Sequence, residues 1–264
     1  MALEKVKLGK LDVTKFILGG NPFSGFSHQT HEANSEMVHY YTAERIKQVF
    51  REAERLGVNT HLGRADHHIM RVLLEYWDEG GTLQWIAQTC PEVGSIQRGI
   101  QNGIAGGASA CFIHGGVMDN LLANNRLGDV PDCIKMIRDA GLPAGVAGHD
   151  PRVFEWAEEH LDCDFYMCCY YNPSSRASKA DHDPDAKEWF RDEDREVMTR
   201  LIAKLSRPAI HYKIMAAGRN RPSEAFAYAA KRMRAGDAVC VGVFPKHRPK
   251  ELEEDARLVE ELMQ

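Results

Sequence analysis

Short runs of apolar residues alternate with longer amphipathic stretches along the whole chain. The runs are rich in aliphatic residues and end at glycine, proline or polar residues, which is typical of strands buried in a parallel sheet. This pattern predicts eight strands, over residues 16–20, 59–63, 83–88, 110–114, 144–149, 165–171, 209–216 and 238–244.

Between these runs, apolar positions recur at the spacing of an α-helix. In the stretch 42–56 they share one face, and Gly57 ends the helix. Asp150 and Pro151 have the residue types of a helix N-cap and first turn. The remaining helices are predicted over about 69–77, 95–104, 130–140, 187–205, 223–235 and 249–263, and a small hairpin over 6–13.

The regular alternation predicts a single (β/α)₈ TIM barrel that spans residues 1–264 and carries an N-terminal β-hairpin. An open α/β sheet is the alternative, but it requires a glycine-rich phosphate turn, which Gly19-Gly20-Asn21-Pro22 does not provide. Two polar segments, 23–41 and 174–186, are too long for tight connections and are expected to be loops over the site.

Composition narrows the classes of partner. Hydrophobic residues make up 44% of the 264 residues, and a net charge of −5 is spread along the chain, so we expect no nucleic-acid partner. No apolar run has the length of a membrane span, and the N-terminus has no signal-peptide core. Seven cysteines without a C-x-x-C motif indicate reduced thiols in a cytoplasmic protein. We expect a small-molecule substrate; no pattern indicates the oligomeric state.

Histidines stand at the ends of several predicted strands. His61, His114 and His149 occupy such positions, and His68 follows the second strand closely. The carboxyl ends of parallel strands meet at one mouth of a barrel, where catalytic groups lie. Each histidine alone fits a structural role, but their convergence favours a functional site. The first three are also candidate ligands of a divalent metal, although no H-x-H or H-E-x-x-H motif occurs.

Charged residues add to the predicted mouth. Arg64 follows the second strand and is a further catalytic candidate, and Asp66 either orients a base or caps the next helix. Lys213 lies two residues after His211, so both are expected on the same face of the seventh strand. A lysine inside a barrel either has a lowered pKa that suits Schiff-base chemistry, or pairs with a carboxylate or the substrate.

A basic cluster follows the last two strands. Arg219, Asn220 and Lys246 leave them at the place where barrels commonly bind phosphate, which suits a cofactor or a phosphorylated substrate; solvated surface is the alternative. Tyr171 and Asn172 end the sixth strand and offer an aromatic face for a ring or a sugar, unless the tyrosine packs in the core.

Three segments resemble the aldo-keto reductase family. Residues 8–21 (LGKLDVTKFILGGN) are similar to the opening hairpin and first strand of that family, 209–219 (AIHYKIMAAGR) to its seventh strand, and 241–244 (VGVF) to its last unit. The resemblance implies an eight-stranded barrel with a hairpin at its N-terminus, and NADP(H) at the carboxyl ends of the strands.

The catalytic tetrad of that family is Asp, Tyr, Lys and His. In this chain Gly63 stands where Asp is expected, His68 where Tyr is expected, and Gln88 where Lys is expected. His114, in Phe-Ile-His-Gly, matches the fourth position. The resemblance therefore implies the fold more directly than it implies hydride transfer.

Three functions follow from these observations. The first is an aldo-keto-reductase-like enzyme that acts on a small carbonyl or polyhydroxy compound with NADP(H), with His68 and His114 as proton donors. The second is a metal-dependent or cofactor-free lyase or isomerase that uses the strand-end histidines. The third is a non-catalytic barrel that binds a ligand. Both enzymatic hypotheses use His114.

Overall fold

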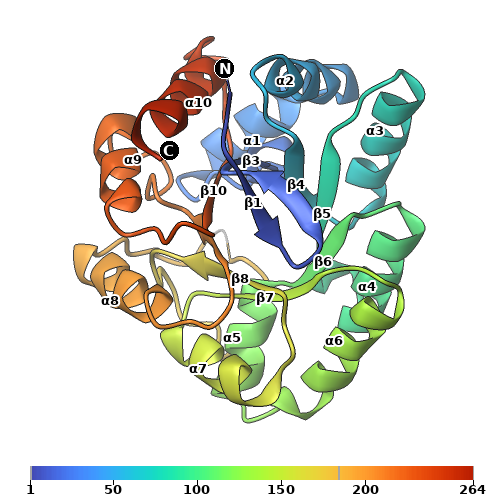
Figure 1. Ribbon diagram of the computed structural model, residues 1–264, viewed down its shortest axis with the longest axis vertical. Helices are drawn as coiled ribbons and strands as arrows, with labels where there is room; N and C mark the ends of the chain where they lie inside the picture. The colour runs from blue at the N-terminus through green and yellow to red at the C-terminus, as the bar shows by residue number, and fades with distance from the viewer. Residues whose placement is uncertain (1, 184, 264) are drawn as a thin grey trace.

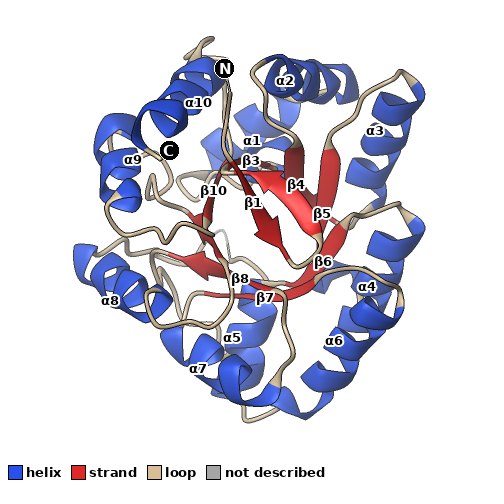
Figure 2. Ribbon diagram, in the orientation of Figure 1, coloured by secondary structure: helices blue, strands red, loops and turns tan. Residues whose placement is uncertain are grey.

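The computed structural model describes residues 2–183 and 185–263. Eight parallel strands form a closed barrel in the order β10-β3-β4-β5-β6-β7-β8-β9, and helices surround it (Figures 1 and 2). The predicted TIM barrel is confirmed. The strands are β3 (Phe16–Gly19), β4 (Thr60–Arg64), β5 (Gln84–Gln88), β6 (Ala110–Ile113), β7 (Ala144–Gly148), β8 (Phe165–Cys169), β9 (Ala209–Tyr212) and β10 (Ala238–Val241).

The helices follow the predicted order with two additions. They are α1 (His31–Tyr40), α2 (Ala43–Arg55), α3 (His67–Asp78), α4 (Ile96–Ala105), α5 (Gly115–Ala123), α6 (Val130–Asp139), α7 (Pro151–His160), α8 (Asp192–Ile202), α9 (Pro222–Ala230) and α10 (Glu251–Leu262). No helix in the described ranges is long and apolar enough to cross a membrane.

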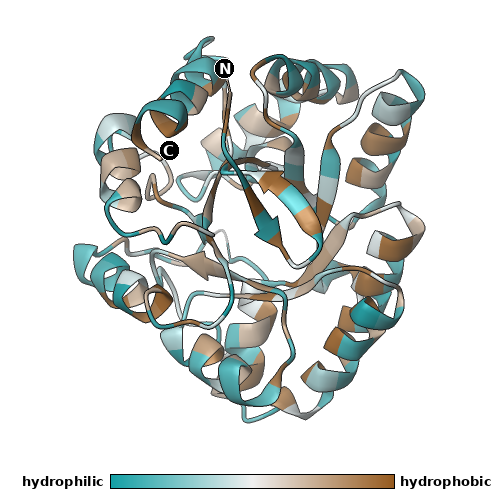
Figure 3. Ribbon diagram, viewed as in Figure 1, coloured by the Kyte–Doolittle hydropathy of each residue, from teal (hydrophilic) through white to brown (hydrophobic). Residues whose placement is uncertain are grey.

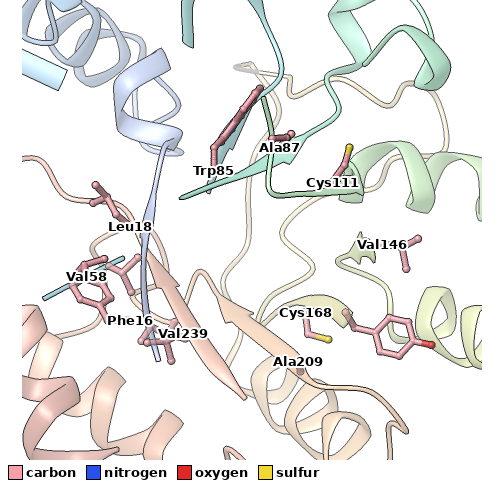
Figure 4. Close-up of a cluster of buried hydrophobic side chains, with 14 of the residues drawn as sticks. Phe16, Leu18, Val58, Trp85, Ala87, Cys111, Val146, Cys168, Ala209 and Val239 are labelled. Carbon is pink, nitrogen blue, oxygen red and sulfur yellow. The ribbon is translucent and has the colours of Figure 1, made fainter. Parts of the chain in front are cut away.

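Successive side chains of each strand point alternately out of and into the barrel, which divides the core into two layers. Outward positions such as Phe16, Trp85 and Val146 pack against the helices (Figure 4), while inward positions such as Ile86 and Phe112 fill the barrel. Brown, apolar helix faces turn toward the barrel and teal, polar faces turn to solvent (Figure 3). All seven cysteines are buried and free.

The N-terminal hairpin covers one end of the barrel. Strands β1 (Lys5–Leu8) and β2 (Leu11–Thr14) pair antiparallel, as predicted, and lie across the barrel in Figure 1. Leu8 and Val13 join the inner hydrophobic layer. The carbonyl of Asp12 accepts hydrogen bonds from the side chains of Asn59 and Gln84, near the N-terminal ends of β4 and β5. The hairpin thus closes the barrel opposite to the strand ends that carry the site.

Two segments form helices that the apolar pattern does not predict. The segment expected to be a loop over 23–41 contains α1, capped by Thr30, with no buried residue on any face. Helix α5 begins at Gly115 and Gly116, directly after β6. Neither helix shows the amphipathic spacing of α2. The Thr30 cap supports α1 locally, whereas two glycines of low helix propensity and four buried residues indicate that tertiary contacts determine α5. The segment 174–186 has no helix or strand in its described part, as expected.

Candidate functional site

A cavity of about 630 Å³ opens at the carboxyl ends of the barrel strands. Its lining combines inward side chains of the barrel with the segments that follow β3, β8 and β9. Of the sequence-predicted residues, it brings together His114, His149, Lys213, Arg64, Arg219 and Asn220. This is the position that TIM barrels use for ligands and catalysis.

His149 is held at the cavity floor by Asp119. The Nδ1 atom of His149 lies 2.6 Å from Oδ2 of Asp119, and the backbone N–H groups of His149 and Asp150 also donate to this carboxylate. Both side chains are only 6% exposed. Asp119 comes from α5, so the unpredicted helix supplies the group that orients the histidine. The Nε2 atom is left facing the hydroxyl of Tyr212, 3.5 Å away.

Cys169 completes a cluster of proton-carrying groups with His149. Burial alone lowers the pKa of His149, but the neighbouring Cys169 and Asp119 outweigh this and raise it. Burial alone raises the pKa of the Cys169 thiol, whereas His149 and Lys213 lower it overall. Alternation places Cys169 on the inner face of β8 and Cys168 on the outer face, as the adjacent pair requires. Asp119, Cys169 and Tyr212 stand in no local sequence pattern that predicts a functional role.

Lys213 reaches the cavity because the backbone departs from strand geometry. Strand β9 ends at Tyr212, and Lys213 has a left-handed φ of 56°. The expectation that Lys213 and His211 share a face is wrong. His211 points outward and contacts Tyr170 and Asp237. Burial lowers the pKa of Lys213, and the charge of Arg176 acts in the same direction.

His114 lies beside His149 with a neutral ring. Burial, together with the charges of His149 and Arg176, keeps its pKa well below the usual value. Its buried Nδ1 atom has no hydrogen-bond partner among the described residues. A neutral imidazole that lines a cavity can donate or accept a hydrogen bond to a ligand.

His61 does not reach the cavity. It occupies an outward position of β4, with its ring between Phe23 and Phe50 and its Nδ1 donating to the carbonyl of Leu18. The predicted metal set of His61, His114 and His149 is therefore not assembled, because alternation turns the first ring into the helix layer.

His68 also lies outside the cavity. It is an exposed residue in the first turn of α3, so it does not face His114. Asp66 caps this helix by accepting from the N–H of Ile69, which was one of its two predicted roles. Arg64 lines the cavity but is neutralised by ion pairs with Asp66 and Glu92, at 2.7 and 3.1 Å.

Only some of the residues predicted to bind a cofactor line the cavity. Arg219 lies over the ring of Phe190 and donates to the carbonyl of His28, while Asn220 donates to the hydroxyl of Tyr171. Lys246 forms an ion pair with Glu36, at 2.6 Å, outside the main cavity.

Tyr171 and Asn172 do not line the cavity. Tyr171 packs against Phe190 in the outer core, and Asn172 is exposed. The aromatic face that the sequence suggested is thus used for packing, because β8 ends at Cys169 and the chain turns outward beyond it.

Two further histidines meet at the cavity rim. His28 follows β3, His182 lies in the loop after β8, and Glu188 from the same loop lies between them. Burial and Lys213 lower the pKa of His28 to about 3, against the effect of Glu188. The histidine content of the two polar segments was the signal that could have indicated this cluster.

Comparison with solved structures supports the fold. A protein described as an aldo-keto reductase from Pseudomonas aeruginosa superimposes with a TM-score of 0.62 at 14% identity, covering 98% of this chain and 94% of that one. A truncated 3-deoxy-D-arabino-heptulosonate 7-phosphate synthase from Thermotoga maritima superimposes with a TM-score of 0.56 at 14% identity, covering 98% of this chain and 90% of that one. A glycerol dehydrogenase from Gluconobacter oxydans superimposes with a TM-score of 0.52 at 11% identity, covering 100% of this chain and 76% of that one.

Sequence comparison assigns no family. No protein-family model matches the chain, and no curated protein matches it. The structural neighbours share a barrel and differ in chemistry, including reductases and an aldolase-type synthase. The resemblance to aldo-keto reductases noted in the sequence therefore extends to the fold, which by itself does not determine the function.

Proposed function

We propose that the protein is an enzyme, and that it moves protons on a small anionic carbonyl or polyhydroxy compound, as a lyase or an isomerase. The observation that carries this proposal is the buried Asp119–His149 pair at the floor of the cavity. A carboxylate that holds Nδ1 of an imidazole fixes its tautomer and leaves Nε2 to exchange protons.

The surrounding residues suit an enolate intermediate. His149 takes a proton from the carbon next to a carbonyl group, and the carbonyl oxygen becomes an enolate oxygen. In an isomerase the deprotonated carbon carries a hydroxyl group, whose O–H proton passes to the former carbonyl oxygen while the proton on His149 is delivered to the former carbonyl carbon, so the carbonyl group moves by one carbon. In a lyase His149 instead takes the proton of a hydroxyl group two carbons from the carbonyl group; the C–C bond between them breaks, its electron pair forms the enolate, and His149 returns the proton to the enolate carbon. The Tyr212 hydroxyl also lines the cavity and can pass the proton to His149.

Two cations favour an anionic substrate. Lys213 and Arg176 line the cavity, and neither forms an ion pair within the part of the chain that the structure describes. Arg176 is buried and donates to the carbonyl of Asp181. Positive groups that are already in place stabilise an enolate or a phosphate without reorganisation. We propose that Lys213 stabilises the negative charge of the substrate and does not form a Schiff base.

Proton exchange tests the proposal directly. The protein is incubated in D₂O with three- to six-carbon oxo acids and sugar phosphates, and loss of the carbon-bound proton is followed by NMR. We expect exchange for at least one compound, and a loss of roughly 100-fold or more in His149→Gln, in the range of a missing acid–base group. His160→Gln is the control, because His160 is exposed and stacks on Trp156. Full exchange in His149→Gln, or none in the unaltered protein, would overturn the proposal.

His114 gives a second prediction for the same assay. We expect His114→Asn to change the free energy of unfolding by less than about 1 kcal/mol, because the ring nitrogen Nδ1 has no partner to lose. Exchange should fall by roughly 100-fold if the ring donates to the substrate oxygen. A variant that unfolds early but keeps its specific rate would show that His114 has only a packing role.

A reductase is the second function with a specific observation in its favour. Arg219 and Arg221 follow β9 and line the same cavity, and the fold matches that of aldo-keto reductases. These residues would face the phosphates of NADP(H). Quenching of protein fluorescence during titration with NADPH checks it, and absence of binding at millimolar NADPH would exclude this function.

A further inference from the structure

Three potential metal ligands converge at the rim of the cavity, apart from the Asp119–His149 pair. They are His28, His182 and Glu188, and their ligand atoms all lie within 4.8 Å of one another. The side chains are 9%, 14% and 7% exposed, respectively. His28 comes from the segment after β3, and the other two come from the long loop after β8, so the cluster joins two segments far apart in sequence.

The geometry is not that of a simple ion pair. Nδ1 of His28 lies 3.0 Å from both oxygens of Glu188, and Nδ1 of His182 lies 3.5 Å from one of the same oxygens. The second distance is longer than an ordinary N–H···O hydrogen bond. The two rings meet edge to face with centroids 4.6 Å apart, and Nδ1 of each ring faces the same oxygen, Oε1 of Glu188.

We propose that His28, His182 and Glu188 bind a divalent transition-metal ion such as Zn²⁺. Two imidazoles and one carboxylate form a donor set that Zn²⁺ and non-haem Fe²⁺ both accept. The 3.0 and 3.5 Å between the imidazole nitrogens and the carboxylate oxygen fit ligands about 2 Å from one ion. This site goes beyond the proposed function, since proton transfer by His149 does not require it.

Three protein ligands leave coordination positions open for water or a ligand. Because His28 and His182 both line the cavity, the open positions face the substrate. A metal there would polarise a carbonyl or hydroxyl oxygen of a molecule that also contacts Lys213. It would also fasten the loop after β8 to the segment after β3.

The neighbouring charges limit the affinity. Glu188 supplies one negative charge, whereas Lys213 and Arg176 lie close enough to influence the cluster from the cavity side. Their repulsion opposes a dication. We therefore expect weaker binding than at a closed four-ligand zinc site, and metal loss during purification in chelator.

The test uses the full chain purified without a histidine tag and treated with chelator. Co²⁺ is titrated while its visible absorption bands are followed, and Zn²⁺ is then used to displace it. We expect one equivalent of Co²⁺ with bands of a four- or five-coordinate ion. His182→Gln should weaken Co²⁺ binding by at least roughly 100-fold, since even the loss of a residue that only hydrogen-bonds to a metal ligand lowers metal affinity by about 10–100-fold.

A matched control lies between the same two segments. His31 and Asp185 form an exposed pair 2.8 Å apart, so His31→Gln removes a histidine–carboxylate contact without touching the cluster. It should bind Co²⁺ as the unaltered protein does. Glu188→Gln provides a second ligand variant, and circular dichroism verifies that each variant is folded.

Two results would overturn the site: less than a tenth of an equivalent of bound metal in the unaltered protein, or equal binding in His182→Gln and His31→Gln. A third measurement is independent of activity. Metal should slow proteolysis of the loop 174–191 in the unaltered protein and not in His182→Gln. Proton exchange on candidate substrates can fail while metal binding persists, so this test and that of the proposed function are distinguishable.

Discussion

Asp255 is a buried carboxyl group on α10 without a hydrogen-bond donor in the described ranges. Burial, together with the charges of Glu251 and Glu254, raises its pKa to about 8 despite the opposing Arg248. In the unfolded chain an aspartate titrates near 4. Between these values the folded state keeps a proton that the unfolded state has released. Stability from this group is therefore complete below about pH 4 and is lost as the pH rises through about 8.

Asp255→Asn should remove this dependence. We expect the unaltered protein to lose up to about 1.4 kcal/mol of unfolding free energy per pH unit over this range, the value for one proton. The variant should show a shallower slope and gain stability relative to the parent as the pH rises. Urea denaturation at pH 5, 6, 7 and 8 measures it. Asp162→Asn, at an exposed position, should leave the slope unchanged; parallel slopes for Asp255→Asn and the parent would contradict the prediction.

Single residues of the site were predictable where strand ends alone determine their position. His114, His149, Arg64 and Lys213 line the cavity as expected, because parallel strands converge at one mouth. Alternation explains why His61 does not, since one residue along a strand reverses the direction of a side chain.

Other members of the site depend on contacts between segments far apart in the chain. Asp119 reaches His149 across 30 residues, and Glu188 reaches His28 across 160. No local pattern encodes such pairs. The left-handed backbone at Lys213 is likewise invisible to an alternation rule, although it determines where the amine lies.

Elements were predictable where their apolar pattern is strong. The eight barrel strands lie within the predicted runs or one residue beyond them, since buried parallel strands are continuous apolar stretches. Helices α1 and α5 were not predicted, because neither has strong amphipathic spacing: α1 buries no residue, and α5 starts with two glycines and is held by tertiary contacts. Because α5 is closely packed against its neighbours, we expect it to be sensitive to the addition of a single methyl group.

Gly116 on α5 supports the loop above it. A Cβ atom at this position would lie 2.3 Å from the carbonyl oxygen of Ala180, a backbone atom that cannot move alone. Alanine raises helix propensity by up to about 1 kcal/mol, but we expect the clash to outweigh it and to cost about 1–3 kcal/mol. Gly116→Ala should also displace the loop 174–186 and increase its cleavage by protease.

Gly128→Ala is the matched control for this change. A Cβ atom there would meet nothing within 4 Å, so stability and cleavage should stay close to those of the parent. If Gly116→Ala resists protease as well as Gly128→Ala does, the loop does not rest on α5 in the way described.

For the whole molecule, the hairpin contributes to the barrel core. Leu8 is fully buried in the inner hydrophobic layer with Ile17 and Ile86. We expect Leu8→Ala to lower the free energy of unfolding by about 2–5 kcal/mol, the range for buried leucine. Leu74→Ala, at an exposed leucine on α3, should change it by less than about 0.5 kcal/mol. Urea denaturation compares them, and equal midpoints would show that the hairpin is only loosely attached.

The hairpin also has a kinetic consequence. Because the hairpin packs on the inward side chains that fill the barrel, the N-terminal end is closed, and a molecule in the cavity arrives and departs through the mouth at the opposite end. If the protein has the proposed enzymatic activity, product must leave the mouth before the next substrate enters. Accumulated product should therefore act as a competitive inhibitor, and turnover should depend on how fast the rim loops let it go.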